Sequence, residues 1–170
     1  MKARSTPVAP ASADWRAKLF AHLARTAGLD AAAVTDALNG RSGLLGLSGT
    51  SNDMRTVEAA AAAGDERAEL ALDVFTARLA KAVGALAVPL GRLDALVFTG
   101  GIGEHSAPVR RRTLERLGVL GLVEDRAANE AHGGGTDGRV SPPGPTVALV
   151  VPTDEELLIA RDTAALVEAS

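Results

Sequence analysis

Apolar residues recur at helical spacing through the first half of the chain. Within residues 66–88 an apolar stripe repeats every three or four positions, and it consists of Leu72, Phe75, Leu79, Val83 and Leu86. This period brings them onto one face of a long helix. Shorter helices are predicted over residues 14–26, 30–39 and 54–63. Between the last two, residues 40–53 are dense in Gly, Ser and Asn and predict a loop, with its leucines tucked underneath.

The pattern changes in the second half, where two short continuous apolar runs predict buried strands. The runs are Asp94–Thr99 and Thr146–Val151. Each precedes a predicted helix, the first over Ser106–Leu117 and the second from Thr153 to about Glu168, and a Gly/Pro-rich loop over 132–145 precedes the second run. Strand followed by helix, twice over, is typical of an α/β fold with a mostly parallel sheet. A buried parallel sheet normally has more than two strands, so the chain has fewer strands than this fold requires.

The composition is that of a globular protein, and the length fits either one domain or a piece of something larger. The chain has 170 residues, of which 46% are hydrophobic and 23% charged. Residues 1–12 are rich in Pro, Ala and Ser and are expected to form a loose leader, which leaves 13–170 as one unit. One Trp, three Phe and no Tyr are present, so the core is expected to consist of Leu, Val and Ala.

Several classes of function are excluded by what the chain lacks. It contains no Cys, which rules out disulfide scaffolds, thiolate zinc sites and cysteine nucleophiles. A net charge of -3 offers no electrostatic footprint for nucleic acid. No apolar run reaches the roughly 20 residues of a membrane span, and no secretory signal is recognisable. A cytoplasmic protein with no membrane partner is therefore expected.

Three glycines stand between the first predicted strand and the helix that follows it, in the segment VFTGGIGEHS at 97–106. Glycine allows close approach of a ligand, and a helix N-terminus favours an anion. The segment is neither a P-loop nor a dinucleotide fingerprint, because it lacks Gly-Lys-Ser/Thr and a third correctly spaced glycine. On its shape alone it fits a nucleotide site and a tight strand-to-helix turn equally well.

Acidic residues open the last predicted helix, in VPTDEELLIA at 151–160. Thr153 and Glu156 have the spacing of a capping box, and acids are favoured in a first helical turn. The pattern therefore favours helix capping. The alternative is a Mg²⁺ ion held by one carboxylate of the cluster and by phosphate oxygens.

A third segment, LSGTSNDMR at 47–55, joins small polar residues to Asp53 and Arg55. These side chains could hold a ribose or a phosphate, or Asn52 or Asp53 could simply cap the next helix. Farther along, the run Arg110–Arg112 precedes Glu115 at salt-bridge spacing and predicts a solvated helix face.

Together and in this order, these motifs resemble the acetate kinase family, which includes acetate, propionate and butyrate kinases. SGLLGLSGTSNDMR is similar to the family's SGLLGxSGxSxDxR segment, and DALVFTGGIGEHSAPVR is similar to its strand and GGIGEN loop. LGVLG and VPTDEELLIARDT are similar to its closing segments. The resemblance extends over about residues 15–168.

The resemblance implies a partial domain of the actin/hexokinase/Hsp70 type (ribonuclease H-like), helix-rich and with few, mostly parallel strands. Family members are more than twice as long and have two such domains with the active site between them. This chain resembles the later part of the C-terminal domain. The family's HLGNG and GTRSG segments, its catalytic Asp and His and its acetate pocket have no counterpart here. A complementary N-terminal half or self-association is therefore expected.

Site residues follow from the same resemblance. Those expected to contact the adenosine part of ATP or ADP are Asp53, Met54, Arg55, Gly101, Ile102, Gly103, Glu104 and His105. Glu155 is the expected Mg²⁺ ligand, and His105 stands where the family usually has Asn. The implied reaction is ATP plus acetate giving ADP and acetyl phosphate, or ATP plus another short-chain carboxylate giving ADP and the corresponding acyl phosphate. No catalytic residue is assigned in this chain. The alternatives are a truncated, non-catalytic remnant that binds nucleotide or a partner chain, and a plain α/β domain whose loops bind nothing.

Overall fold

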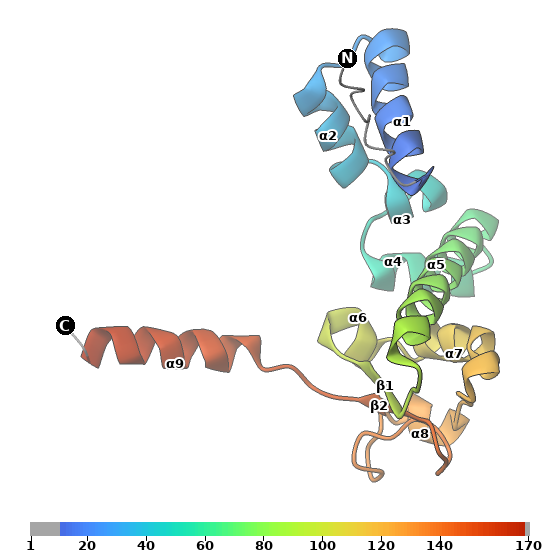
Figure 1. Cartoon of the computed structure of the whole chain (residues 1–170), viewed down its shortest axis with the longest axis vertical. Coiled ribbons are helices and arrows are strands. Elements are labelled where there is room, and N and C mark those ends of the chain that lie inside the picture. Colours follow the sequence, from blue (N-terminus) through green and yellow to red (C-terminus); the bar gives the residue numbers. More distant parts are fainter. Residues whose placement is uncertain (1–10, 169–170) are drawn as a thin grey trace, which may run out of the picture.

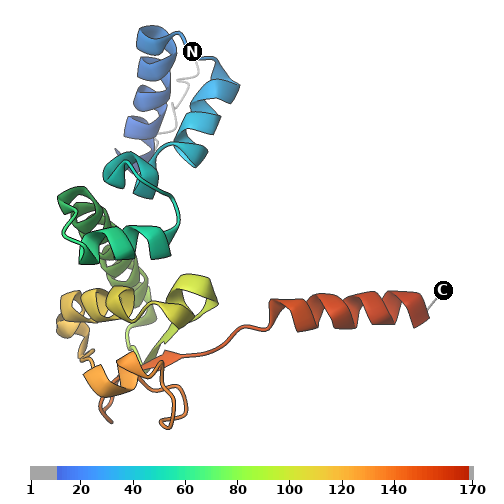
Figure 2. The ribbon, with the colours of Figure 1, turned by 180° about the vertical axis from the view of Figure 1, so that it is seen from behind.

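The computed structural model describes residues 11–168, which form an elongated arrangement of helices beside a small sheet (Figure 1). In chain order the elements are α1 (Ala11–Ala27), α2 (Ala31–Gly40), α3 (Gly43–Ser48), α4 (Met54–Ala62), α5 (Glu66–Leu90), β1 (Ala95–Phe98), α6 (Gly100–His105), α7 (Ala107–Arg116), the 3-10 turn η1 (Gly118–Leu120), α8 (Arg126–Glu130), β2 (Val147–Val150) and α9 (Glu155–Glu168). The α1–α2 hairpin lies at one end and the sheet at the other, with α9 projecting sideways (Figures 1 and 2).

Aspartate side chains start three of the predicted helices. Asp30 accepts a hydrogen bond from Ala33 N at 2.8 Å, and Asp65 accepts from Arg67 N and Ala68 N at 2.9 and 3.0 Å. Asp53 caps α4 in the same way. Each bond satisfies an amide that the first turn of a helix leaves unpaired. The first helix begins at Ala11, inside the expected leader, and residues 1–10 lie outside the described part.

Two segments predicted as loops are helical. Residues 40–53 contain α3, whose Leu44 and Leu47 pack against the core between α4 and α5. This packing outweighs the low helix propensity of glycine. Residues 100–105 form α6, where the Glu104 carboxylate accepts a hydrogen bond from Gly100 N at 2.8 Å. The predictions of loops were wrong because glycine content does not reveal the contacts that hold these segments as helices. The predicted packing of the leucines of residues 40–53 is confirmed for Leu44 and Leu47.

Both predicted strands are confirmed, and they pair in parallel with Ala95 opposite Val147 and Phe98 opposite Val150. The other edge of β2 is partly covered by the Gly/Pro-rich loop, since Val140 N donates to Ala148 O at 2.9 Å. Gly138 comes so close to β2 that a Cβ there would lie 2.4 Å from Val150 O. Only glycine fits at that position, which also has φ +80°.

Two apolar clusters form the core. One surrounds the sheet and contains Ala80, Phe98, Leu114, Leu117, Leu122, Val140, Ala148 and Val150. The other lies between α4, α5 and α7 and contains Met54, Val57, Ala68, Ala71, Leu72 and Val109. Phe98 is the one aromatic among these buried residues, as the composition predicts. The predicted stripe on α5 is wrong only for Leu86, which is 68% exposed in the last turns of that helix.

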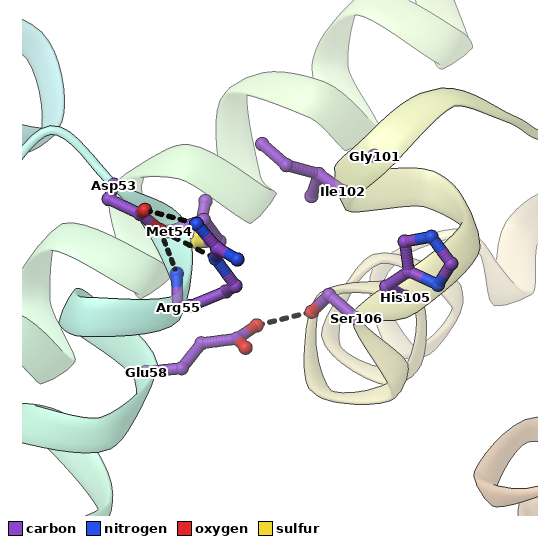
Figure 3. Close-up of a pocket in the computed structure, with 8 residues that line it drawn as sticks. All are labelled: Asp53, Met54, Arg55, Glu58, Gly101, Ile102, His105 and Ser106. Atoms are coloured by element: carbon purple, nitrogen blue, oxygen red, sulfur yellow. Dashed lines mark hydrogen bonds and ion pairs between the residues drawn. The ribbon is translucent and has the colours of Figure 1, made fainter.

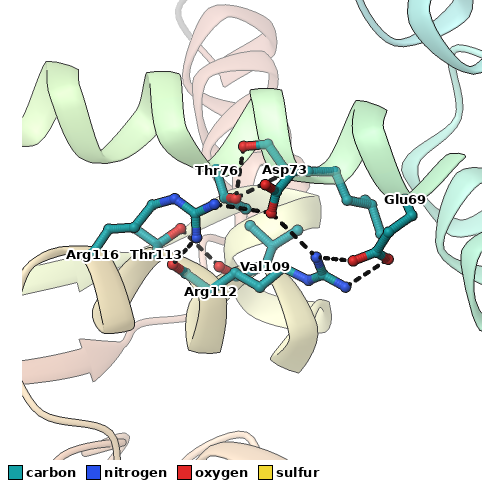
Figure 4. A network of polar contacts seen from close by, with 8 residues as sticks. Glu69, Asp73, Thr76, Val109, Arg112, Thr113 and Arg116 are labelled. Carbon is teal, nitrogen blue, oxygen red and sulfur yellow. Dashed lines mark hydrogen bonds and ion pairs between the residues drawn. The ribbon is translucent and has the colours of Figure 1, made fainter. Parts of the chain in front are cut away.

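Ion pairs join α5 to α7 (Figure 4). Arg112 holds both carboxylate oxygens of Glu69 at 2.7 and 2.9 Å, and Arg116 pairs with Asp73 at 2.9 Å. Arg110 is fully buried. The prediction of a solvated arginine face paired with Glu115 was therefore wrong. Helix α5 brings carboxylates to Arg112 and Arg116, and the end of α6 and Asn129 enclose Arg110.

The last helix does not begin with the predicted capping box. Asp154 caps it instead, accepting from Leu157 N at 2.9 Å, while the Thr153 hydroxyl donates to Glu104 at 2.7 Å. Glu104 also accepts from Thr153 N at 2.9 Å, and this is the amide that Glu156 would bond in a capping box. Among the helices of residues 11–168, none is both long and apolar enough to cross a membrane.

Candidate active site

The start of α4 and the short helix α6 enclose a cavity of about 300 Å³ (Figure 3). Its lining residues are Asp53, Met54, Arg55, Glu58, Gly101, Ile102, His105 and Ser106. Six of these eight are residues that the sequence predicts for nucleotide binding. The structure therefore brings two segments that are distant in sequence to opposite walls of one cavity.

The α4 wall is organised by the cap of that helix. Asp53 accepts from Arg55 N at 2.9 Å, and the Arg55 guanidinium folds back onto the same carboxylate, with Nη2 2.8 Å from Oδ2. The hydrogen bonds from the Arg55 side chain and then from its backbone lower the pKa of Asp53 to about 2. Met54 is only 4% exposed and anchors this corner in the core. An ion pair between Asp53 and Arg55 therefore lies at the rim of the cavity, where the Arg55 side chain is 88% exposed.

The α6 wall depends on its glycines. Gly100 has φ +71°, which allows the chain to turn directly from β1 into the helix. At Gly101 a Cβ would meet nothing within 4 Å, so this position faces open space in the cavity. Gly103 differs, because a Cβ there would lie 3.2 Å from the Phe98 carbonyl carbon. Gly103 therefore lies against β1 and does not line the cavity.

Glu104 lies on a neighbouring cavity of about 390 Å³, which Gly101 and His105 also line. Its Oε1 accepts from Gly100 N at 2.8 Å, from Thr153 N at 2.9 Å and from the Thr153 hydroxyl at 2.7 Å. The hydrogen bonds from Thr153, first from its backbone and then from its side chain, lower the pKa of Glu104. The carboxylate therefore ties α6 to the segment that leads into α9.

The second cavity is lined by side chains whose oxygen atoms could coordinate a metal ion, next to the predicted metal ligand. Thr153, Asp154 and Glu156 line it, and α9 begins at Glu155, whose side chain lies outside the described part. Among the described residues no group of three or more acidic or histidine side chains could hold a metal ion alone. Mg²⁺ is commonly held by one or two carboxylates together with phosphate oxygens, and this donor set fits such a site.

Two residues of the main cavity were missed from the sequence. Ser106 caps α7 by accepting from Val109 N at 3.1 Å, and its hydroxyl donates to Glu58. Glu58 lies four residues after Met54, on the same face of α4, so helical spacing could have indicated it. The Ser106 contact depends on the approach of two separate helices and carries no local signal.

Comparison with known proteins identifies the family. A sequence model of the Acetokinase family matches residues 1–161. The chain belongs to the acetokinase family. It is 58% identical over 149 residues to the acetate kinase of Deinococcus radiodurans, covering 88% of this chain and 37% of that protein. It is 52% identical over 155 residues to the acetate kinase of Chromobacterium violaceum, covering 91% and 39%.

Solved structures agree with this acetokinase assignment. The chain matches a propionate kinase from Francisella tularensis with a TM-score of 0.77 and 37% identity, covering 92% of this chain and 38% of that one. It matches the Porphyromonas gingivalis acetate kinase with a TM-score of 0.77 and 38% identity, covering 96% and 39%. The predicted partial actin-type α/β fold, helix-rich with a small parallel sheet, is confirmed. The chain spans about two fifths of the length of these relatives.

Proposed function

We propose that this chain supplies the nucleotide side of an ATP-dependent phosphotransferase with a carboxylate acceptor, acetate + ATP ⇌ acetyl phosphate + ADP. The observation that carries the proposal is the cavity between Asp53–Arg55 and Gly101–His105. Its volume of about 300 Å³ is at the lower end of the range for small-molecule sites, which suits one part of a nucleotide.

In this proposal the adenosine portion occupies the main cavity. The apolar side chains of Met54 and Ile102 contact the base, and the open space at Gly101 permits close approach of the ligand. The charged and polar groups of Asp53, Arg55 and Glu58 are available to ribose hydroxyls. A nucleotide bound here can extend its phosphates into the second cavity, because Gly101 and His105 line both.

The metal side of the site lies at the start of α9. Glu155 is the proposed Mg²⁺ ligand, with Asp154 and Glu156 as its neighbours on the second cavity. When bound, Mg²⁺ would neutralise charge on the phosphate oxygens. Glu104 would hold this segment against α6 through its hydrogen bonds to Thr153.

The acceptor side is proposed to come from the part of the family fold that this chain does not span. Phosphoryl transfer depends on positioned charges around the reacting groups, and the family's transition-state arginine and acetate pocket have no counterpart among these residues. The chain alone is therefore expected to bind nucleotide without catalysing turnover. A complementary N-terminal part of an acetate kinase is the proposed partner.

Calorimetric titration of the purified chain with ADP and ATP, with and without Mg²⁺, tests the proposal. Weak binding is expected, and no acetyl phosphate should form above background. Addition of the N-terminal part of a related acetate kinase should restore turnover. If nucleotide binds but the pair stays inactive, the non-catalytic alternative replaces this proposal. Absence of binding even at millimolar nucleotide would contradict the site itself.

A further inference from the structure

Arg110 lies directly behind the α6 wall and is fully buried, with 0% of its surface exposed. Buried arginines usually pair with carboxylates. Here the N–H groups of the guanidinium point instead to backbone carbonyls, to a side-chain amide and to the ring of His132. Nε donates to Asn129 Oδ1 at 2.6 Å and Nη2 to Asn129 O at 2.8 Å. Nη1 donates to the carbonyls of Gly103 and Glu104, both at 2.8 Å.

Those two carbonyls belong to the C-terminal end of α6. A helix leaves its last carbonyls without partners inside the helix, and a helix of six residues has few other bonds to hold it. Ser106 N donates to the Ile102 carbonyl at 3.0 Å, and Arg110 donates to the next two carbonyls, those of Gly103 and Glu104. A cation at this end also complements the helix dipole. Arg110 therefore replaces the hydrogen bonds that a longer helix would make within itself.

The other side of the guanidinium is fixed to the α8 region. Asn129 is 1% exposed and donates onward to Ala107 O at 3.0 Å and Glu124 at 2.6 Å. His132 Nδ1 lies 3.0 Å from Nη2 of Arg110 and 2.9 Å from the Glu104 carbonyl oxygen. It accepts from the guanidinium in one tautomer and donates to the carbonyl in the other, so in either state the ring contacts the end of α6 or the arginine that holds it. His132 has φ 52°, a conformation that a non-glycine residue keeps only where its surroundings hold it.

We propose that Arg110 is the positioning residue of the nucleotide site: by joining the end of α6 to Asn129 and His132, it fixes Gly101 and His105 on the cavity wall. This inference rests on the proposed nucleotide site for its effect on affinity. Arg110 itself does not line the cavity. It acts through the backbone of α6, so its loss changes where the wall lies without removing a ligand contact.

Arg110→Lys tests the proposal, because lysine keeps the charge but has only three donors on a single nitrogen. Arg112→Lys is the matched control, since Arg112 lies on the same helix but pairs with Glu69 of α5. Amide hydrogen exchange of residues 101–106 is measured without nucleotide, and ADP affinity is measured by titration. Arg110→Lys should speed exchange and weaken ADP binding, each about tenfold. Arg112→Lys should leave both nearly unchanged.

His132→Gly provides a second variant in case Arg110→Lys does not fold. Glycine tolerates the positive φ of this position, so the change removes only the ring that contacts Arg110 Nη2 and the Glu104 carbonyl. Faster exchange in α6 is expected here too, by a smaller factor. Equal exchange in α6 for the unsubstituted chain and for the Arg110 or His132 variant would overturn the positioning role. If the unsubstituted chain binds no ADP, the proposed nucleotide site fails, and the exchange rates alone decide the role of Arg110.

Discussion

The hydroxyl of Ser106 donates a hydrogen bond to the carboxylate of Glu58, and this contact joins the two walls of the cavity (Figure 3). The two residues are 48 positions apart. Glu58 lies in α4, on the wall that begins with Asp53, whereas Ser106 lies between α6 and α7. Ser106 is only 4% exposed, so the contact is shielded from water on its side. One hydrogen bond between side chains therefore links the two walls of the cavity directly.

Removal of Glu58 should affect the cavity more than the fold. In Glu58→Ala the two walls lose their direct link, and we expect weaker nucleotide binding with a small change in melting temperature. Ser106→Ala loses the same link and also the cap of α7, which is worth about 1 kcal/mol. Its melting temperature should fall by about 2–4 °C more than that of Glu58→Ala. Thermal unfolding and ADP titration of both variants check this, and equal melting temperatures would contradict it.

A side chain at Gly101 should block the site without disturbing the fold. A Cβ there meets nothing within 4 Å, so Gly101→Val is expected to fill the cavity, abolish nucleotide binding and leave the melting temperature nearly unchanged. Gly103→Val is the comparison, because its Cβ would press against the Phe98 backbone at 3.2 Å. That variant should lower the melting temperature. Retained ADP binding by Gly101→Val would show that the ligand lies elsewhere.

The Asp53–Arg55 pair should respond to acid at unusually low pH. The pKa of Asp53 is lowered from 3.8 to about 2 in the folded chain, so its contribution to stability is complete above about pH 4. That contribution is lost as the pH falls toward 2 and the carboxylate becomes protonated. Carboxyl-detected NMR titration should give a midpoint of about 2. In Arg55→Gln the midpoint should rise toward 3.8, and an unchanged midpoint would contradict the assigned cause.

Loss of Arg112 should weaken the contact between α5 and α7. Its bidentate bond to Glu69 is shielded on the arginine side only, since 20% of the Arg112 side chain but 51% of the Glu69 side chain is exposed. Arg112→Met keeps the apolar stem and should cost roughly 1 kcal/mol, or about 2–4 °C in melting temperature. Arg111→Met on the same helix is the control, because no ion pair involves Arg111 among the described residues. Equal effects of the two substitutions would show that the ion pairs contribute nothing measurable.

The chain is expected to self-associate, or to bind a complementary segment, rather than stay a compact monomer. Among residues 11–168 no third strand pairs with the outer edge of β1, and Val97 and Val151 are about half exposed. The projecting helix α9 also exposes Ile159. Unpaired edges and exposed apolar side chains favour association.

Sedimentation velocity over a range of concentrations measures this association. Ile159→Lys should reduce it more than Ala160→Lys, which places the same charge at an exposed alanine of α9. Hydrogen exchange of β1 and β2 provides the second measurement. A monodisperse monomer with strong amide protection in both strands would show that the segment completes its own core.

Much of the local structure of this chain is determined by contacts within a few residues. Asp30, Asp53 and Asp65 each bond an amide two or three positions ahead, so the starts of α2, α4 and α5 can be predicted from sequence. The apolar runs of β1 and β2 likewise need no distant partner to be recognised. The resemblance to the family indicates the segments Asp53–Arg55 and Gly101–His105, whereas spacing alone leaves a helix cap open for the first and a tight turn equally open for the second.

The tertiary structure decided which of several competing partners each polar group takes. Thr153 and Glu156 have the spacing of a capping box, but the amide and the hydroxyl of Thr153 both donate to Glu104, 49 positions away. Arg112 had Glu115 nearby but bonds Glu69, 43 positions away. Local spacing specifies which bonds a side chain can make, whereas the packing of α5 against α7 and of α6 against the turn before α9 decides which are made. Both contacts are open to solvent, so the physical cause is the packing of the elements, which brings each distant carboxylate to 2.7 Å from its donor.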